Sequence, residues 1–135
     1  MRTDTEQMGV QPILEIDAGD VQYRQLNTRL RNAVVSGTQK IVIRNVHGQR
    51  YIGTNLGKPV DVEVYGTPGN DLGAFMDGPR ITVHGNAEDG CGNTMNSGEI
   101  IVHGSSGDIL GMSARGGKIF VRHDVGCRAG IHMKE

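Results

Sequence analysis

The sequence predicts an all-β fold: a right-handed parallel β-helix of about five coils, preceded by one strand and a capping α-helix. The first observation is a glycine-punctuated phrase that recurs every nineteen residues. The second is composition, because glycine fills 21 of 135 positions, about twice the usual share of roughly 7%, and there is no Trp. The third is helical periodicity confined to one segment near the N-terminus. A chain so poor in large rings needs a core of small repeated layers, with glycine at the bends.

Columns of similar residues keep a single interval along the chain. Pairs of β-branched residues recur nineteen residues apart: Val62/Val64, Ile81/Val83, Ile100/Val102 and Ile119/Val121. An earlier pair, Ile41/Ile43, precedes the first of these by twenty-one residues. Four glycines hold the same register and form a predicted structural glycine ladder: Gly73, Gly92, Gly111 and Gly130. An interval kept across four copies indicates a repeat architecture.

The length of the repeat selects among the possible architectures. Nineteen residues are too few for a pair of helices, and the leucine frame of a leucine-rich repeat is missing. They suffice for three short strands and three turns, so that coils stack with their strands about 4.8 Å apart. A left-handed β-helix is built on hexads and coils of about eighteen residues. The observed interval departs from that pattern, and we favour the right-handed form.

The chain divides into three segments: a polar tail at 1–12, a strand and helix at 13–39, and the β-helix at 40–135. The alternation in "ILEID" predicts a strand at 13–17, and apolar residues at helical spacing predict a helix within 20–37. We expect Asp20 to cap the start of this helix, and Ser36 with Gly37 to end it. Together the strand and helix are expected to cover the first, otherwise open, end of the β-helix.

Composition and charge exclude several classes of function. A net charge of -1 gives no electrostatic footprint for nucleic acid. No apolar run approaches the roughly 20 residues that span a bilayer, and the start "MRTDTEQ" is unlike a signal peptide. We therefore expect a cytoplasmic protein without nucleic-acid or membrane partners. In that compartment Cys91 and Cys127 are expected to be free thiols.

The repeat also resembles a known family. Residues 65–135, from "YGTPGNDLGAFMDG" to "GCRAGIHMKE", resemble the C-terminal glycine-repeat (GXGXG) domain of the glutamate synthase large subunit. One of the subunits of formylmethanofuran dehydrogenase has a related repeat. The stretch "IVIRNVHGQRYIG", residues 41–53, resembles the beginning of stand-alone archaeal and bacterial versions of the domain. The resemblance implies a right-handed parallel β-helix, in agreement with the spacing.

The resemblance implies a supporting function. In glutamate synthase, a glutaminase domain with an N-terminal cysteine nucleophile releases ammonia. A barrel domain with flavin and an iron–sulfur cluster joins that ammonia to 2-oxoglutarate, and the glycine-repeat domain packs against both. This sequence starts with Met1, and its two cysteines are too few for a typical four-cysteine cluster. We therefore expect no catalytic residue and no cofactor in this chain. Flavin and the iron–sulfur cluster are expected on glutaminase-like and synthase-like partner chains, in an oxidoreductase complex of nitrogen metabolism.

One surface column is a candidate for binding or chemistry. The repeat aligns four residues that each follow an inward-pointing valine and therefore face outward: Tyr65, His84, His103 and Arg122. His84 and His103 are expected to stack about 4.8 Å apart. A metal or anion site is one interpretation, but zinc requires a third ligand and Arg122 opposes a cation. We favour a partner-contact face, because aromatic and Arg side chains supply much of the binding energy at protein interfaces.

Two functions stay open at this point. The first is a non-catalytic scaffold subunit that organises the partner chains. The alternative is a self-associating β-helix enzyme with a site at the His84/His103 ladder. Cys91 falls in a core column and Cys127 at a turn position, so we expect neither a catalytic thiol nor a disulfide between them. The last coil ends in an open edge, which predicts a homo-oligomer or an obligate complex.

Overall fold

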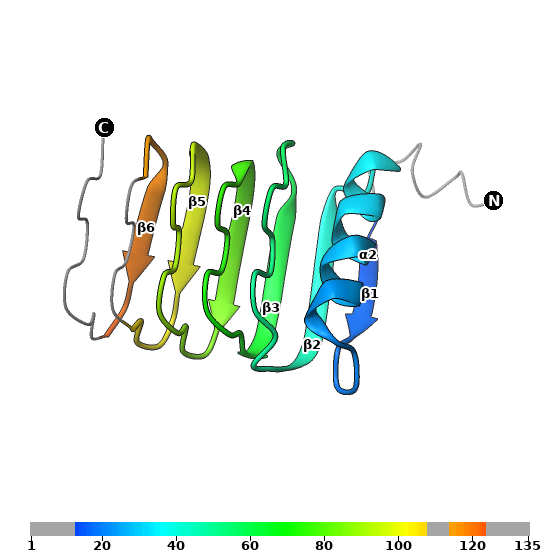
Figure 1. Cartoon of the computed structure of the whole chain (residues 1–135), viewed down its shortest axis with the longest axis horizontal. Helices are drawn as coiled ribbons and strands as arrows, with labels where there is room; N and C mark the ends of the chain where they lie inside the picture. Colours follow the sequence, from blue (N-terminus) through cyan, green and yellow to red (C-terminus); the bar gives the residue numbers. More distant parts are fainter. Residues whose placement is uncertain (1–12, 108–113, 124–135) are drawn as a thin grey trace.

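A computed structural model describes residues 13–107 and 114–123, which form one parallel sheet of six strands and one helix (Figure 1). The elements are β1 (Ile13–Asp17), α2 (Tyr23–Val35), β2 (Lys40–His47), β3 (Asp61–Thr67), β4 (Asp77–His84), β5 (Ser97–Val102) and β6 (Lys118–Val121). Each strand pairs in parallel with the next one along the chain. The predicted right-handed parallel β-helix, with a strand and a helix at its N-terminal end, is confirmed. The expected tail at 1–12 lies outside the described residues.

The register of the sheet explains the interval of nineteen residues. Ile81 pairs with Val62 in the preceding strand and with Ile100 in the following one. Two inward columns result: Ile41, Val62, Ile81, Ile100, Ile119 and Ile43, Val64, Val83, Val102, Val121. The members on β2 to β5 are buried, and those on β6 pack against the core while remaining partly exposed. One repeat is therefore one coil, and the repetition places like side chains above one another.

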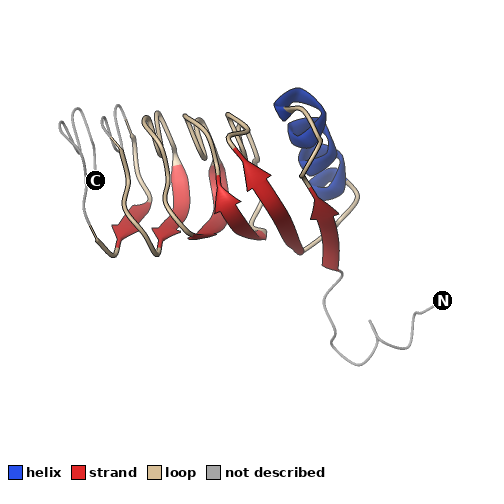
Figure 2. Cartoon of the chain, turned by 90° about the horizontal axis from the view of Figure 1, so that it is seen from below, coloured by secondary structure: helices blue, strands red, loops and turns tan. Residues whose placement is uncertain are grey.

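The sequence predicts three short strands per coil, and this detail is wrong. In the part of the chain that the structure describes, each coil has one regular strand, and its other sides are turns and loops (Figure 2). The cause is a left-handed backbone at alternating positions. In the coil that starts with β3, φ is 63° at Asp71, 69° at Gly73 and 62° at Phe75. A parallel strand needs φ near −120°, so this side of the coil cannot be extended.

A turn unit of five residues, with left-handed φ at its first, third and fifth positions, recurs in three coils: Tyr51/Gly53/Asn55, Asp71/Gly73/Phe75 and Gly90/Gly92/Thr94. Its amide groups bond to the neighbouring coils. The Gly73 N–H donates to the Ile52 carbonyl of the preceding coil at 2.7 Å, and the Phe75 N–H donates to the Asn93 carbonyl of the following coil at 2.9 Å. In each unit the fourth residue also donates to the carbonyl of the first and so closes a turn within the unit. The Ala74 N–H, for example, donates to the Asp71 carbonyl at 3.2 Å. The unit thus satisfies its backbone without forming a strand.

Glycine occupies the third position of the turn unit for two reasons. The left-handed backbone is costly for a residue with a Cβ. The position is also crowded, because a Cβ on Gly73 would lie 2.8 Å from Cδ1 of Ile100, and one on Gly92 would lie 2.5 Å from Cδ1 of Ile119, so that the isoleucine side chain would have to shift. The glycines therefore let the turns pack directly on the inward isoleucine column.

Gly53 takes the equivalent place one coil earlier. A Cβ there would lie 2.6 Å from Cδ1 of Ile81. It precedes Gly73 by twenty residues rather than nineteen, and so it escapes the alignment that predicts the glycine ladder. Two members of that predicted ladder, Gly111 and Gly130, lie outside the described residues.

Helix α2 begins later than the sequence suggests. Its N-cap is Gln22, whose side chain makes no capping hydrogen bond, so the prediction that Asp20 caps the helix is wrong. Asp20 lies in a turn two residues ahead of the N-cap, which is too early for its carboxylate to cap the first turn. The predicted end at Ser36 and Gly37 is confirmed, with φ of 96° at Gly37. No helix within the described ranges is long and apolar enough to cross a membrane.

The helix completes the first coil through one buried side chain. Asn27 is 5% exposed; its Nδ2 donates to the Arg50 carbonyl at 3.0 Å, and its Oδ1 accepts from the Gly53 N–H at 3.2 Å. In the next two coils the equivalent glycine N–H donates to the coil before it. At Gly53, Oδ1 of Asn27 on α2 is the acceptor instead of a backbone carbonyl of a preceding coil. The helix therefore satisfies a backbone group that an uncovered end would leave unpaired.

Candidate partner-binding face

The outward side chains of the strands lie in rows across the coils. Strands in a parallel sheet keep one register, so each outward position is repeated from coil to coil. Asp61 pairs with Arg80, Glu63 with Thr82, and Tyr65 with His84. The outer surface of β2 to β6, which we call the strand face, therefore carries three rows: a charged row, a mixed row and an aromatic row.

The aromatic row contains the four residues of the predicted partner face. The Tyr65 and His84 ring centroids are 4.4 Å apart with an angle of 11° between the planes, and those of His84 and His103 are 5.2 Å apart with an angle of 16°. The Arg122 N–H donates to the Val102 carbonyl at 2.9 Å, which places this residue on the next rung with an exposed side chain. The structure thus brings all four residues into one row, and three of them form a continuous stack.

Arg44 extends the row at its N-terminal end. Its Cζ lies 4.9 Å from the centroid of the Tyr65 ring, which is a cation–π arrangement. Its Nε donates to Oε2 of Glu15 at 2.7 Å, and this hydrogen bond and charge raise the pKa of Arg44. Sequence reasoning missed Arg44, although it follows Ile43 just as Tyr65 follows Val64. The interval of twenty-one residues in the first coil hides this correspondence.

His84 is held at its edge as well as on its faces. Its Nε2 lies 2.5 Å from Oε1 of Glu63, a carboxylate in the adjacent mixed row. Because a carboxylate accepts, this contact places a proton on Nε2 and fixes the tilt of the ring. Stacking against Tyr65 and His103 fixes the ring plane. Neighbouring side chains therefore hold the centre of the aromatic row on both ring faces and at one edge.

The two histidines are poorly arranged as metal ligands. Their rings are stacked in nearly parallel planes, and a ring nitrogen binds metal in the plane of its ring. Nitrogens on stacked rings therefore point side by side rather than at one centre. Among the residues that the structure describes, no group of three or more His, Cys, Asp or Glu is placed to hold a metal ion.

The charged row alternates in sign along the β-helix: Lys40, Asp61, Arg80, Glu99 and Lys118. Nε of Arg80 donates to Oε1 of Glu99 at 2.8 Å, and this bond, with the nearby Asp61 charge, raises the pKa of Arg80. Sequence reasoning missed the row, although each member directly precedes a β-branched pair. Between the charged and aromatic rows lies Phe120, which is 52% exposed. The strand face therefore combines charge, aromatic stacking and one apolar ring.

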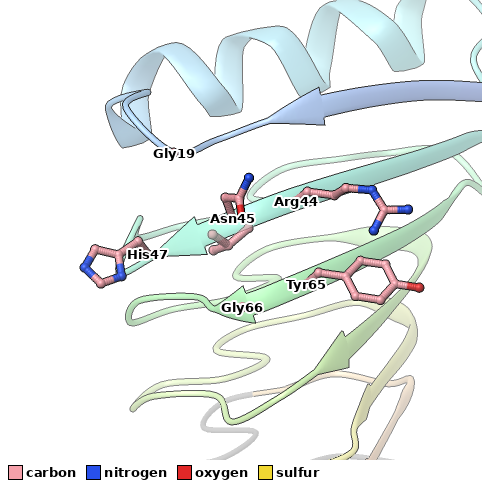
Figure 3. A pocket seen from close by; sticks show the side chains of 7 residues that line it. Gly19, Arg44, Asn45, His47, Tyr65 and Gly66 are labelled. Atoms are coloured by element: carbon pink, nitrogen blue, oxygen red, sulfur yellow. The ribbon is translucent and has the colours of Figure 1, made fainter.

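A surface depression of about 600 Å³ adjoins the N-terminal end of the aromatic row (Figure 3). It is lined by Gly19, Arg44, Asn45, Val46, His47, Tyr65 and Gly66. Asn45 forms a bulge in β2 with φ of 58°, and its Nδ2 donates to Oδ1 of Asp17 at 3.0 Å. The Gly19 N–H and then Asn45 lower the pKa of Asp17 by bonding to its charged form. In Figure 3 Arg44 and Tyr65 extend to the same side while His47 points the other way, so these three do not converge on one reacting atom.

Cys91 is a core residue. It is 1% exposed, and burial raises the pKa of its thiol to about 12. A thiol with that pKa carries almost no thiolate at neutral pH, and thiolate is the reactive form. Cys127 and Arg128, the other thiol and its basic neighbour, lie outside the described residues.

These features define a class of protein: a parallel β-helix domain whose described surface presents rows of ordered side chains. A model of the GXGXG motif family matches residues 20–135, and the chain belongs to this family, whose motif is of the type found in the C-terminal domain of glutamate synthase. The resemblance stated from the sequence is thereby confirmed. The structure gives the motif a physical meaning, because the left-handed positions at Gly90, Gly92 and Thr94 alternate in the same way as the glycines of the motif.

A curated relative comes from Methanocaldococcus jannaschii. The chain is 55% identical over 122 residues to its uncharacterized protein MJ1350, an alignment that covers 88% of this chain and 47% of that protein. The chain thus spans about half the length of this relative. No solved structure matches the chain.

Proposed function

We propose that this chain is a non-catalytic scaffold subunit that resembles the C-terminal domain of glutamate synthase. It organises glutaminase-like and synthase-like partner chains in glutamate and nitrogen metabolism. Family membership supports this proposal, and the stack of Tyr65, His84 and His103 is the observation that carries it. The flavin and iron–sulfur cluster belong to the partner chains, and none is assigned to this one.

The physical reason is preorganisation. A side chain that is already fixed loses little rotamer freedom when a partner binds, and ordering such side chains otherwise costs affinity. Arg44 lies over the Tyr65 ring at one end of the stack, and Glu63 holds the edge of the His84 ring. Tyr and Arg are also the residue types that dominate binding energy at protein interfaces. The aromatic row is therefore suited to contact with a partner chain.

The direct test is a pull-down of the tagged protein from its native cells, followed by mass spectrometry. We expect glutaminase-like and flavin- or iron–sulfur-containing chains in stoichiometric amounts. The double variant His84→Ala/His103→Ala should reduce their recovery about tenfold or more. Thr82→Ala/Ile101→Ala, on the same strands but in the mixed row, is the matched control and should retain them. Recovery of only the tagged chain, or full recovery by the histidine variant, would overturn the proposal.

The proposal includes assembly as a homo-oligomer or an obligate complex. Light scattering after size-exclusion chromatography measures the mass at micromolar concentration. The expected mass is at least twice the 14.5 kDa of one chain, or that of a complex with other chains. A clean monomer that binds no other chain would contradict it.

A second candidate is a self-associating enzyme with its site at the His84/His103 ladder. The bond between Glu63 and His84 favours it, because a carboxylate that orients an imidazole is one element of general base catalysis. Hydrolysis of amide and ester substrates by the purified chain, abolished by Glu63→Gln and by His84→Ala, would support this candidate. Hydrolysis that both variants retain would exclude it.

A further inference from the structure

Helix α2 carries charge of one sign only. Its thirteen residues, YRQLNTRLRNAVV, include three arginines and no acidic residue. Leu26, Leu30 and their neighbours are buried on one side, whereas Arg24, Arg29 and Arg31 are all exposed. The whole chain has a net charge of -1. This positive charge is therefore a local concentration and does not reflect a basic protein.

The arginines at this end have no acidic partner in the described part of the chain. The ion pairs found there join Arg44 to Glu15, Arg80 to Glu99 and His84 to Glu63, all on the strand face or on the adjoining strand β1. Arg24 and Arg50 instead lie over one ring, with their Cζ atoms 5.6 and 5.2 Å from the Tyr23 centroid. Two like charges beside one tyrosine raise the local positive potential. Among the described residues no ion pair joins Asp17 or Asp20, which precede the helix, to these arginines.

The outer surface of the helix has a shallow depression. A depression of about 550 Å³ is lined by Val21, Arg24, Gln25, Thr28 and Arg29. The half-buried Val21 supplies an apolar group, and the methylene stems of the two arginines add further apolar surface while their charged ends reach water. The depression therefore offers apolar contact surrounded by positive charge and hydrogen-bonding side chains.

We propose that this α2 basic face, formed by Arg24, Gln25, Thr28, Arg29 and Arg31, docks an acidic segment of a partner protein. The segment carries several Asp or Glu side chains and one apolar side chain that enters the depression beside Val21. Charge complementarity identifies this occupant, because the planar guanidinium group binds carboxylates through paired hydrogen bonds. Figure 2 shows α2 on the turn side of the coils, opposite the strands. It is therefore a second docking surface, separate from the aromatic row.

The dimensions of the face favour a protein partner over a nucleic acid. The helix from Arg24 to Arg31 extends only about 10 Å, which is short for the stripe of phosphate contacts that nucleic-acid binding requires. An apolar side chain on the partner also finds a place in the depression, whereas a sugar–phosphate backbone has none to offer.

Fluorescence anisotropy with defined probes tests the proposal. The probes are a labelled amphipathic peptide with glutamates beside a leucine stripe, its counterpart with lysines, and a single-stranded oligonucleotide. We expect the full chain to bind the glutamate peptide in a salt-sensitive manner and to ignore the lysine peptide. Arg24→Gln/Arg29→Gln/Arg31→Gln should weaken this binding about tenfold, since each exposed ion pair contributes only a small factor.

The matched control removes the same number of positive charges from the other side of the molecule. Lys40→Gln/Arg80→Gln/Lys118→Gln, on the charged row, should bind the glutamate peptide within about twofold of the parent. Thermal unfolding of both triple variants verifies that they are folded. Equal weakening by both variants, equal binding of both peptides, or tighter binding of the oligonucleotide would overturn the proposal. None of these results depends on the aromatic row, so the outcome is separate from that of the scaffold test.

Discussion

Replacing Asn27 with leucine tests whether one side chain closes the first coil. The two side chains are similar in size, so the substitution deletes hydrogen bonds without opening a large cavity. It leaves the Arg50 carbonyl and the Gly53 N–H without their hydrogen-bond partner, which lies 3.0 and 3.2 Å from them in the parent. Each buried polar group left without a partner costs about 1–3 kcal/mol. The Gly53 N–H is buried and the Arg50 carbonyl only partly so, and the free energy of unfolding should therefore fall by about 1–4 kcal/mol.

Urea denaturation followed by circular dichroism measures this loss. Asn32→Leu, at an exposed position on the same helix, is the control and should change the free energy of unfolding by no more than about 0.5 kcal/mol. Hydrogen exchange at the Gly53 amide gives a second measurement, because this amide should be protected in the parent and exchange rapidly in the variant. A loss similar to that of the control, with the Gly53 amide still protected, would refute the account of how α2 completes the coil.

Three further predictions follow from individual residues. Gly73→Ala should lower the free energy of unfolding by about 2–4 kcal/mol, because the new residue would have both a strained left-handed backbone and a crowded Cβ. Gly57→Ala is the control, since no atom lies within 4 Å of the added Cβ, and it should change the free energy of unfolding little. Equal losses for the two variants in denaturation would contradict the turn geometry. Hydrogen bonds lower the pKa of Asp17 below 3.8 in the folded state, so its stabilising contribution is complete above that value and is lost as the pH falls through the folded pKa. Asp17→Asn should accordingly flatten the decline in stability below about pH 4, and an unchanged decline would count against this assignment. In a Cys127→Ser background, Cys91, with a pKa of about 12, should react with iodoacetamide only after unfolding; rapid labelling of the folded protein would show that the thiol is accessible.

The strands could be predicted because repetition fixes their pairing. When Val62, Ile81 and Ile100 recur at one interval, stacking places them in register, and the pairing and parallel direction of their strands follow. The path between the strands was harder to predict. Asp71 and Phe75 adopt φ of 63° and 62°, a region that sequence rules assign mainly to glycine and asparagine. Hydrogen bonds to the neighbouring coils stabilise them there, and a single coil read in isolation contains no such partners.

The candidate face was predictable only where the repeat is regular. The row from Tyr65 to Arg122 follows the nineteen-residue interval. The first coil is two residues longer, one of them supplied by the bulge at Asn45, and this length conceals Arg44. Asn27 was out of reach for a different reason, since its function depends on a carbonyl more than twenty residues away. The error at Asp20 is of the same kind, because a capping rule considers the adjacent residues and not the turn that leads into the helix.

The two proposed docking surfaces should act independently. They lie on opposite sides of a closely packed β-helix (Figure 2), and a core of stacked side chains transmits little displacement unless it has two alternative arrangements. Binding at one surface should therefore leave the affinity of the other unchanged to within about 0.5 kcal/mol. Titrating the glutamate peptide into the chain alone, and into its complex with a glutaminase-like partner, measures this coupling. A larger coupling would show that the surfaces overlap or that the partner itself reaches α2, and the assumption of two separate docking sites would be wrong.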